Sequence, residues 1–270
     1  VDYPKENQKY KISEATMCGG GSSNNAAYLL AMWGNDVTLA SCIGNDDHGK
    51  KIKEELISVG VKTNYLKEYP YPTTTSYIIN NLRNGSRTII TNKLKEMSLK
   101  KNMEIKEDFD VIFLDGNDYE LSLEVLRKYP NAIKIIDAGS LKYGIEELCS
   151  LCDYIVCSND FLRDYTKVDF KCHEIEKVEK AFDILQQKFS GLVITTLEEY
   201  GSLTKINNQY YHIPSIKVKS VDTTGAGDIF HGAFTHFIAN NYPLLDALRY
   251  ANITGALSVS KIGCKNSMPK

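Results

Sequence analysis

Residues 221–234 read VDTTGAGDIFHGAF, and this stretch is the most informative for the fold. The residues before it, Tyr210–Val221, have a strand-like pattern, and those after Asp228 are strongly apolar with helical spacing. Gly225 and Gly227 allow the backbone to turn sharply and to approach a ligand without a Cβ atom in the way. We therefore expect a strand, a glycine-rich turn and a helix that starts at about Asp228.

The turn also predicts chemistry. Main-chain N–H groups of residues 225–228 would converge at the positive end of the helix, where anions bind readily. An ordinary N-cap explains an Asp before an apolar run, but not the Gly-Ala-Gly that precedes it. A carboxylate repels phosphate unless it has a role, and accepting the proton of an attacking hydroxyl is such a role.

Residues 222–228 resemble the Asp-Thr-x-Gly-Ala-Gly-Asp signature of the ribokinase-like (PfkB-type) carbohydrate kinase family at every fixed position. The resemblance implies transfer of the γ-phosphoryl group of ATP to a hydroxyl of a small sugar-like substrate, with Mg²⁺ as cofactor and K⁺ as an optional further cation. It assigns the following roles: Asp228 is the general base, Gly225, Ala226 and Gly227 form the anion hole, and Asp222 organises the phosphate and cation end of the site.

A second match lies near the N-terminus. Residues 20–27, with Gly34 and Gly44, resemble the N-terminal signature of the family in spacing, although Ser23 stands where Gly, Ala or Pro is preferred. The resemblance implies that Gly20, Gly21 and Asn25 face the acceptor sugar. Glycines permit close approach of the backbone, and an Asn side chain both donates and accepts hydrogen bonds. A helix N-cap with a flexible lead-in is the alternative.

Shorter matches concern the nucleotide and the metal. Thr196 and Gly201 lie in a segment that resembles the Thr-Leu-Gly-x-x-Gly nucleotide loop of the family, with Glu198 in place of the first Gly. Asn252 and the segment 261–269, which contains Gly263, resemble the adenine and monovalent-cation region; a core helix and a surface loop are the alternative. Asn159 resembles the Asn of an Asn-x-x-Glu motif near Mg²⁺, but Leu162 stands at the Glu position, and Asp160 or Asp164 are candidates to replace it.

One similar motif is rejected. Residues 44–51, GNDDHGKK, nearly match a P-loop, which ends in Lys followed by Ser or Thr. Lys51 provides no hydroxyl for Mg²⁺, and Asp46 and Asp47 would put negative charge where phosphates belong. The segment instead resembles the Gly-x-Asp-x-x-Gly turn of the family, in which the Asp is largely structural.

Composition limits the classes of function. The chain has 270 residues, 43% of them hydrophobic, and a net charge of −2, so it has no general attraction for nucleic acid or anionic membranes. No apolar run approaches the roughly 20 residues that span a bilayer. Seven scattered cysteines are too sparse for a disulfide scaffold, and Cys149, Cys152 and Cys157 lack a nearby fourth metal ligand. We expect reduced thiols and a cytoplasmic protein.

Short runs rich in Val, Ile and Leu alternate with helical patterns, which predicts parallel strands covered on both faces. The expected strands are Val37–Ile43, Val111–Leu114, Ile133–Ile136, Tyr154–Val156 and Leu192–Thr195. The expected helices are Asn25–Trp33, Lys50–Val59, Leu121–Lys128, Ile145–Leu151, Val178–Phe189, Ile229–Asn240 and Pro243–Lys261. We therefore expect an α/β fold: one ribokinase-like domain over residues 1–270, with three α/β/α layers and a mostly parallel central sheet.

Residues 73–92 interrupt this alternation, because two β-rich arms flank Asn84-Gly85, a strong hairpin signal. We expect a small lid formed by about residues 3–18 and 73–92, with further strand at Lys9–Ile12. Such a lid would close over the sugar and exclude water. The resemblance implies a homodimer that pairs through it.

Two alternatives stay open: a nucleoside or vitamin-type kinase on the same fold, and a homologue that binds a metabolite or nucleotide without catalysis. A dehydrogenase is disfavoured because no Gly-x-Gly-x-x-Gly follows an early strand. Residues 1–7 resemble the segment just after the first strand of the family, so we expect that strand, and a short last helix, to lie outside the sequence.

Overall fold

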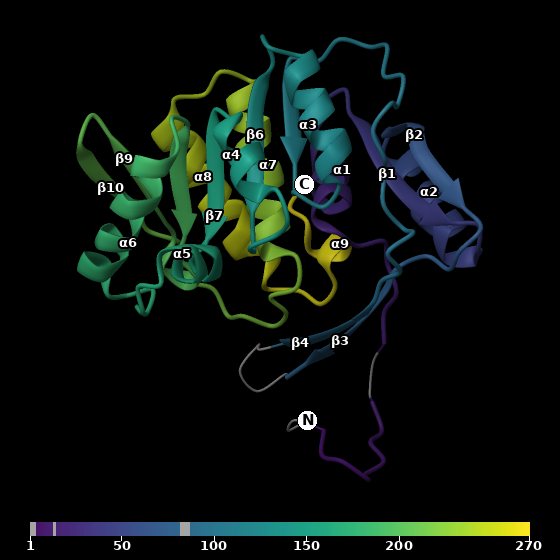
Figure 1. Ribbon diagram of the computed structural model, residues 1–270. Coiled ribbons are helices and arrows are strands. Elements are labelled where there is room, and N and C mark those ends of the chain that lie inside the picture. Colours follow the sequence, from purple (N-terminus) through teal and green to yellow (C-terminus); the bar gives the residue numbers. More distant parts are fainter. Residues whose placement is uncertain (1–3, 13–14, 82–86) are drawn as a thin grey trace. The chain divides into compact units, whose positions relative to one another are not determined.

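The computed structural model describes residues 4–12, 15–81 and 87–270 (Figure 1). Two compact units make up the chain: residues 1–97, 218–229 and 254–270 form the first, and residues 98–217 and 230–253 form the second. The assignment of the whole chain to one domain stays a prediction.

A six-stranded sheet forms the centre of the second unit, in the order β10-β9-β8-β7-β6-β5. Its parallel strands are β5 (Val111–Leu114), β6 (Ile133–Ala138), β7 (Tyr154–Ser158) and β8 (Leu192–Thr196). The antiparallel strands β9 (Ser202–Ile206) and β10 (Gln209–Ile213) extend it at one edge. The mainly parallel sheet confirms the predicted fold class.

The expected strand over Tyr210–Val221 is mostly wrong. Strand β10 ends at Ile213, and residues 214–221 contain no strand. Pro214 follows at once, and proline has no N–H to donate to a neighbouring strand, so pairing ends there. The glycine-rich turn is thus preceded by an irregular segment.

Helices cover both faces of this sheet, which confirms three layers (Figure 1). One face carries α3 (Tyr119–Lys128), α4 (Ile145–Ser150), α5 (Asn159–Thr166) and α6 (Ile175–Lys188). The other is covered by α7 (Ala226–Ala239) and α8 (Leu244–Ser258), in their parts that belong to this unit. Ile136, Ile155 and Val193 pack with α4, α5 and α6 in one core, while the rings of Tyr154 and Phe234 meet on the α7 side.

The sequence prediction missed α5, because its eight residues are mostly polar and too few to show a repeated helical pattern. A capping signal could have revealed it: the Ser158 hydroxyl accepts a hydrogen bond from the N–H of Phe161 at 2.9 Å. The short elements η1 (Glu198–Tyr200) and α9 (Cys264–Ser267) were also not predicted.

In the first unit, α1 (Ser22–Met32) and α2 (Asp47–Ser58) pack with the parallel pair β1 (Thr38–Gly44) and β2 (Lys62–Tyr69). Strand β2 escaped prediction because only Leu66 in it is buried. Asp46 caps α2: its carboxylate accepts the N–H groups of Gly49 and Thr73, both at 2.8 Å. This contact supports the structural interpretation of the Gly-x-Asp-x-x-Gly segment.

A separate antiparallel hairpin, β3 (Thr75–Asn80) and β4 (Arg87–Asn92), forms the predicted small lid sheet. The predicted Asn84-Gly85 turn lies outside the described residues. No strand forms over Lys9–Ile12, so that expectation is wrong. Residues 5–10 form local side-chain hydrogen bonds instead, in which the Tyr10 hydroxyl accepts from the N–H of Lys5 and donates to Gln8.

Candidate functional site

The glycine-rich turn leads directly into α7, which begins at Ala226, two residues before the predicted start. Gly225 has φ +76°, and a Cβ atom there would overlap the Sγ of Cys264, so only glycine fits. Gly227 is exposed, and a Cβ atom there would meet nothing within 4 Å. The N–H of Ala226 donates to Thr223 O at 3.3 Å, which closes the turn. The turn therefore presents an open face at Gly227.

Asn25 and Asp228 meet although they lie 203 residues apart in the chain. The Nδ2 atom of Asn25 donates to Oδ2 of Asp228 at 2.6 Å. Asn25 is 4% exposed, and its buried Oδ1 has no hydrogen-bond partner among the described residues. A buried acceptor without a partner is costly, and a ligand hydroxyl would satisfy it. The contact thus joins the two predicted signatures in one site.

The Gly20-Gly21 turn lies at the start of α1, next to Asn25. Gly21 has φ +97°, and its carbonyl accepts the N–H of Asn25 at 2.9 Å. A Cβ atom on either glycine would meet nothing within 4 Å. The space beside the turn is therefore open, as a sugar-facing turn requires.

Asp222 anchors the start of the loop. It is buried, and its two oxygens accept the N–H groups of Thr224 and Gly263, each at 2.9 Å. Burial by itself would raise the pKa of this carboxyl, but these hydrogen bonds and the charge of Arg87 hold the pKa below its ordinary value. Asp222 and Gly263 therefore shape the loop, and their roles toward cations stay predictions.

The lid sheet contributes one contact to this loop. Arg87, the first residue of β4, donates from Nη1 to the carbonyl of Thr223 at 3.1 Å and to its hydroxyl at 2.6 Å. A guanidinium next to the turn adds positive charge where a phosphoryl group is expected.

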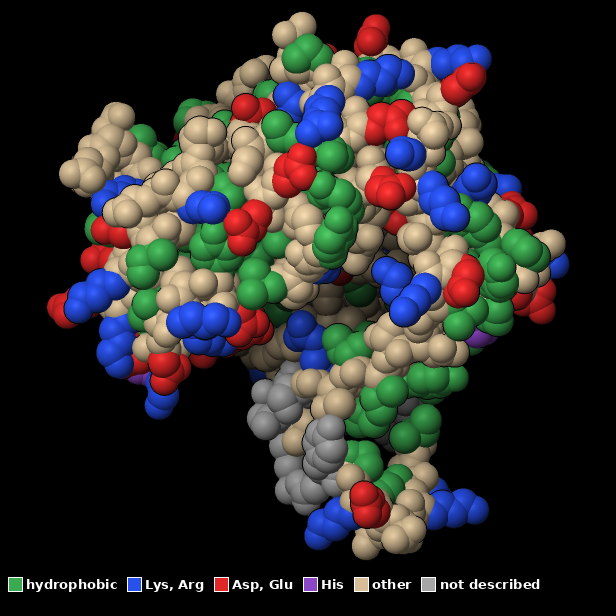
Figure 2. Space-filling view, in the orientation of Figure 1, with side chains coloured by type: hydrophobic (Ala, Val, Ile, Leu, Met, Phe, Trp, Pro, Cys, Tyr) green, Lys and Arg blue, Asp and Glu red, His purple; other side chains and the backbone are tan. Residues whose placement is uncertain are grey.

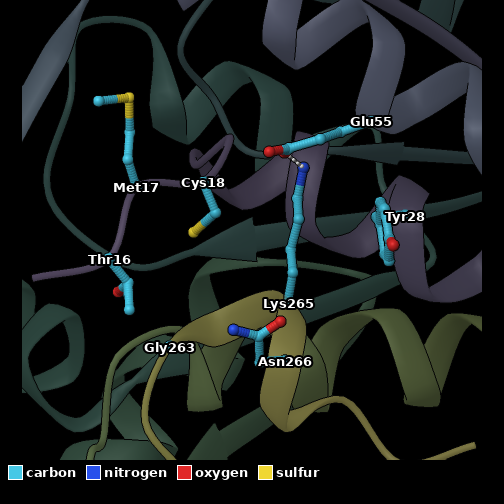
Figure 3. Close-up of a pocket in the computed structure, with 8 residues that line it drawn as sticks. All are labelled: Thr16, Met17, Cys18, Tyr28, Glu55, Gly263, Lys265 and Asn266. Carbon is cyan, nitrogen blue, oxygen red and sulfur yellow. Dashed lines mark hydrogen bonds and ion pairs between the residues drawn. The ribbon is translucent and has the colours of Figure 1, made fainter.

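Figure 3 shows a pocket of about 220 Å³ in the same unit. The segment 16–18, which precedes the glycine run, forms one wall, and α9 with Gly263 forms another. The pocket is lined by Thr16, Met17, Cys18, Tyr28, Glu55, Gly263, Lys265 and Asn266. Lys265 and Glu55 point toward one another in it, and neither was singled out from the sequence (Figure 3).

In the second unit, Asn159 begins α5 at the carboxyl end of β7. Its Nδ2 donates to Oε1 of Glu198 at 3.0 Å and to the Sγ of Cys172 at 2.8 Å. Glu198 follows β8, the neighbouring strand, and adopts the left-handed φ of +53°. Ligands of parallel sheets bind at such carboxyl ends. The sequence prediction missed Glu198 as a partner of Asn159.

Neither proposed substitute for the missing Glu lies beside Asn159 in this way. Leu162 is fully buried in the core, Asp160 pairs with Arg163, and Asp164 is exposed. The carboxylate that contacts Asn159 is that of Glu198.

The other predicted nucleotide residues have mainly structural contacts. Thr196 donates weakly to Cys157 O at 3.5 Å, and a Cβ atom on Gly201, which has φ +95°, would overlap the carbonyl of Ile213. Asn252 is buried, and its Nδ2 donates to Ser202 Oγ at 3.0 Å and to Ile213 O at 2.9 Å. Asn252 therefore holds β9 and β10 together.

Among the described residues, no group of three or more His, Cys, Asp or Glu side chains could hold a metal ion. Mg²⁺ does not require such a group, since one or two protein oxygen ligands, substrate phosphates and water suffice. The carboxylate of Glu198 and Oδ1 of Asn159 fit this pattern. None of the seven cysteines, all of which the structure describes, forms a disulfide, and burial raises the pKa of Cys152 and Cys157 to about 12, which leaves both thiols unreactive. In the part of the chain that the structure describes, no helix could span a bilayer.

Comparisons with known proteins identify the family and the fold. A profile described as "pfkB family carbohydrate kinase" matches residues 1–270. Ribokinase from Lactococcus lactis subsp. lactis is 28% identical over 265 residues, which cover 95% of this chain and 84% of that protein. Deoxyribokinase from Salmonella typhi is 25% identical over 275 residues, which cover 98% and 89%. The structure of Arabidopsis thaliana ribokinase with ribose and ATP has a TM-score of 0.82 at 22% identity and shares the fold over 99% of this chain and 90% of that one.

Proposed function

The chain belongs to the pfkB family of carbohydrate kinases, and on this premise we propose that Asp228 is the base that drives phosphoryl transfer from ATP to a sugar hydroxyl. The observation that carries the proposal is the 2.6 Å hydrogen bond between Asn25 and Asp228, next to the glycine-rich turn. This bond places the side-chain amide of Asn25, which can donate to and accept from sugar hydroxyls, beside the carboxylate of Asp228 in the first turn of α7.

In the proposed reaction the acceptor hydroxyl attacks the γ-phosphorus, its proton passes to the Asp228 carboxylate, and ADP leaves. Asn25 orients that carboxylate through Nδ2, and its partnerless Oδ1 is suited to accept a sugar hydroxyl. The first turn of α7, residues 225–227, would stabilise the charge that develops on the phosphoryl oxygens. Arg87 adds positive charge there.

Mg²⁺, when bound with ATP, would neutralise charge on the phosphates. We assign its protein contacts to Asn159 and Glu198, because the two side chains meet at the carboxyl ends of adjacent strands. Thr196 and Gly201 belong to the proposed nucleotide loop, and Asn252 supports it from within the unit. Asp222 and Gly263 remain our candidates for a monovalent-cation region.

The acceptor is proposed to be a pentose or a pentose-like sugar, since relatives over nearly the whole chain are named ribokinase and deoxyribokinase. A cytoplasmic location suits a chain whose seven cysteines, all within the described residues, form no disulfide.

We also propose a homodimer through the lid. Tyr77, Ile79 and Ile90 share one face of the hairpin, opposite the face of Arg87, and are 66%, 39% and 57% exposed. Figure 2 shows hydrophobic side chains gathered in the region of this hairpin. An exposed apolar face of this kind marks an interaction surface.

A substrate panel assayed by ADP release tests the function. Ribose, deoxyribose, fructose, adenosine and an amino-sugar conjugate are offered with Mg-ATP. We expect a pentose to give ADP and a phosphorylated product. Adenosine as the best acceptor would favour a nucleoside kinase, and nucleotide binding without transfer to any acceptor would favour a non-catalytic homologue.

A further inference from the structure

We propose that Glu55 and Lys265 are positioning residues for the acceptor substrate, because together they fix the main-chain turn that faces it. The proposal rests on the proposed function of the Gly20-Gly21 turn and adds two residues to it.

One carboxylate oxygen makes both contacts. Oε2 of Glu55, in α2, accepts a hydrogen bond from the N–H of Gly19 at 2.8 Å. The same oxygen accepts one from Nζ of Lys265, in α9, also at 2.8 Å (Figure 3). Gly19 directly precedes the turn. The ion pair therefore holds the backbone at the point where the turn begins.

This contact explains the first glycine of the run. A Cβ atom on Gly19 would lie 2.7 Å from Nζ of Lys265 and 3.0 Å from Oε2 of Glu55. Gly20 and Gly21, in contrast, face open space. A side chain on Gly19 would displace the ends of Lys265 and Glu55 from these positions, whereas its two neighbours leave room for a ligand.

The same short segment also supports the phosphate side. The N–H of Gly263 donates to Asp222, and Sγ of Cys264 occupies the place where a Cβ atom of Gly225 would lie. Residues 263, 264 and 265 thus contact the anion loop twice and, through Glu55, the sugar-facing turn once. The segment 263–265 therefore contacts both the anion loop and, through Glu55, the residue that precedes the Gly20-Gly21 turn.

The burial of the pair favours a positioning role over simple stabilisation. The side chains of Lys265 and Glu55 are 7% and 22% exposed, and Nζ lies 4.7 Å from the ring centre of Tyr28. Desolvation offsets most of the attraction in such a pair, and an apolar pair of similar shape is often as stable. An apolar pair could not accept the N–H of Gly19, whereas the carboxylate of Glu55 does so while it pairs with Lys265.

The test compares Lys265→Met, Glu55→Met and the double variant with wild type, because a Met side chain cannot accept the Gly19 N–H as Glu55 does. Asp36→Asn is the matched control, since Asp36 and Lys62 form an exposed pair of the same unit at 2.7 Å. We expect the sugar KM of the variants to rise about tenfold, the effect of losing one hydrogen bond to a charged group, with kcat within about twofold and the ATP KM unchanged. Hydrogen exchange over residues 16–25 should become faster, while β1 and β2 stay protected.

The double variant separates positioning from stability, because it leaves no unpaired buried charge. Its Tm should return close to wild type while the sugar KM and the exchange of residues 16–25 stay raised. Recovery of all three to wild-type values would overturn the proposal. If wild type phosphorylates no sugar, the proposed function fails, and the exchange of residues 16–25 still decides whether the pair holds the turn.

Discussion

In the proposed reaction, single residues carry the chemistry, and Asp228 is the proposed base. The buried amide of Asn25 donates a hydrogen bond to the carboxylate of Asp228 near the start of a helix. This one contact fixes the position of the carboxylate. Three substitutions test the roles of single residues.

Asp228→Asn should lower kcat at least about 10²-fold, because an amide cannot accept the hydroxyl proton. ATP affinity, measured by calorimetry, should be retained. The exposed Asp169 in the second unit provides a control, since Asp169→Asn should leave both quantities unchanged. Turnover of Asp228→Asn within a factor of two of wild type would exclude the base role.

Gly225 and Gly227 should respond differently. Gly225→Ala forces a Cβ atom onto Cys264 at φ +76°, so the free energy of unfolding should fall by about 1–3 kcal/mol. Gly227→Val points into open space, so we expect an unchanged Tm with activity abolished by a blocked phosphate approach. Normal turnover in a folded Gly227→Val protein would contradict an anion hole at this turn.

At the scale of elements, the ends of strands and helices bring the polar groups together. Ser158 of β7 pairs with Thr196 of β8, and Asn159 and Glu198 therefore project from neighbouring strand ends. In the first unit, the start of α2 is tied to the segment before β3 through Asp46.

Glu198→Gln should weaken the coupling between Mg²⁺ and ATP, since the carboxylate next to Asn159 is lost. In calorimetric titrations, Mg²⁺ should tighten ATP binding by a smaller factor in the variant than in wild type. The adjacent, exposed Glu199 is the control, and Glu199→Gln should behave as wild type. Identical Mg²⁺ effects in wild type and Glu198→Gln would remove Glu198 from the metal site.

Asp46 should make the stability of the first unit depend on pH. The Thr73 hydroxyl is the main cause that lowers the pKa of Asp46 from 3.8 to about 2. Because the folded pKa is the lower one, the stabilisation is complete above about pH 4 and is lost as the pH falls toward 2. Unfolding of Asp46→Asn, followed from pH 2 to 7, should lack this dependence, and Asp47→Asn, at an exposed neighbour, should retain it.

At the scale of the whole molecule, the residues named in the proposal are divided between the two compact units. The acceptor side, with Asn25 and Asp228, belongs to the first, and Asn159 and Glu198 belong to the second. The lid hairpin is part of the first unit and presents an apolar face.

Ile90→Lys should weaken self-association, because it puts a charge in the centre of that apolar face. Sedimentation velocity should show a dimer for wild type and a larger monomer fraction for the variant. Ile57→Lys changes an exposed isoleucine on α2 and should leave association unchanged. A monomeric wild type at all concentrations would refute the lid dimer.

Much of the fold could be predicted because it depends on local patterns. All seven expected helices and five expected strands occur, with bounds shifted by a few residues. Strand β2 was missed because it buries only Leu66, and helix α5 was missed because eight mostly polar residues are too short for a repeated pattern. The strand expected over Tyr210–Val221 was predicted too long, because the strand-like pattern continues past Pro214 although proline cannot donate a hydrogen bond to a neighbouring strand.

The sequence by itself determined the class of fold and the turn at residues 221–228, since backbone freedom, apolar spacing and helix capping act over a few residues. Tertiary structure alone decided that the Asn25 amide meets Asp228, that Glu198 takes the place beside Asn159, and that Gly19 rests on Glu55. These contacts join residues 36 to 203 positions apart. Which distant side chains meet is set by how strands and helices pack, and no local pattern contains that information.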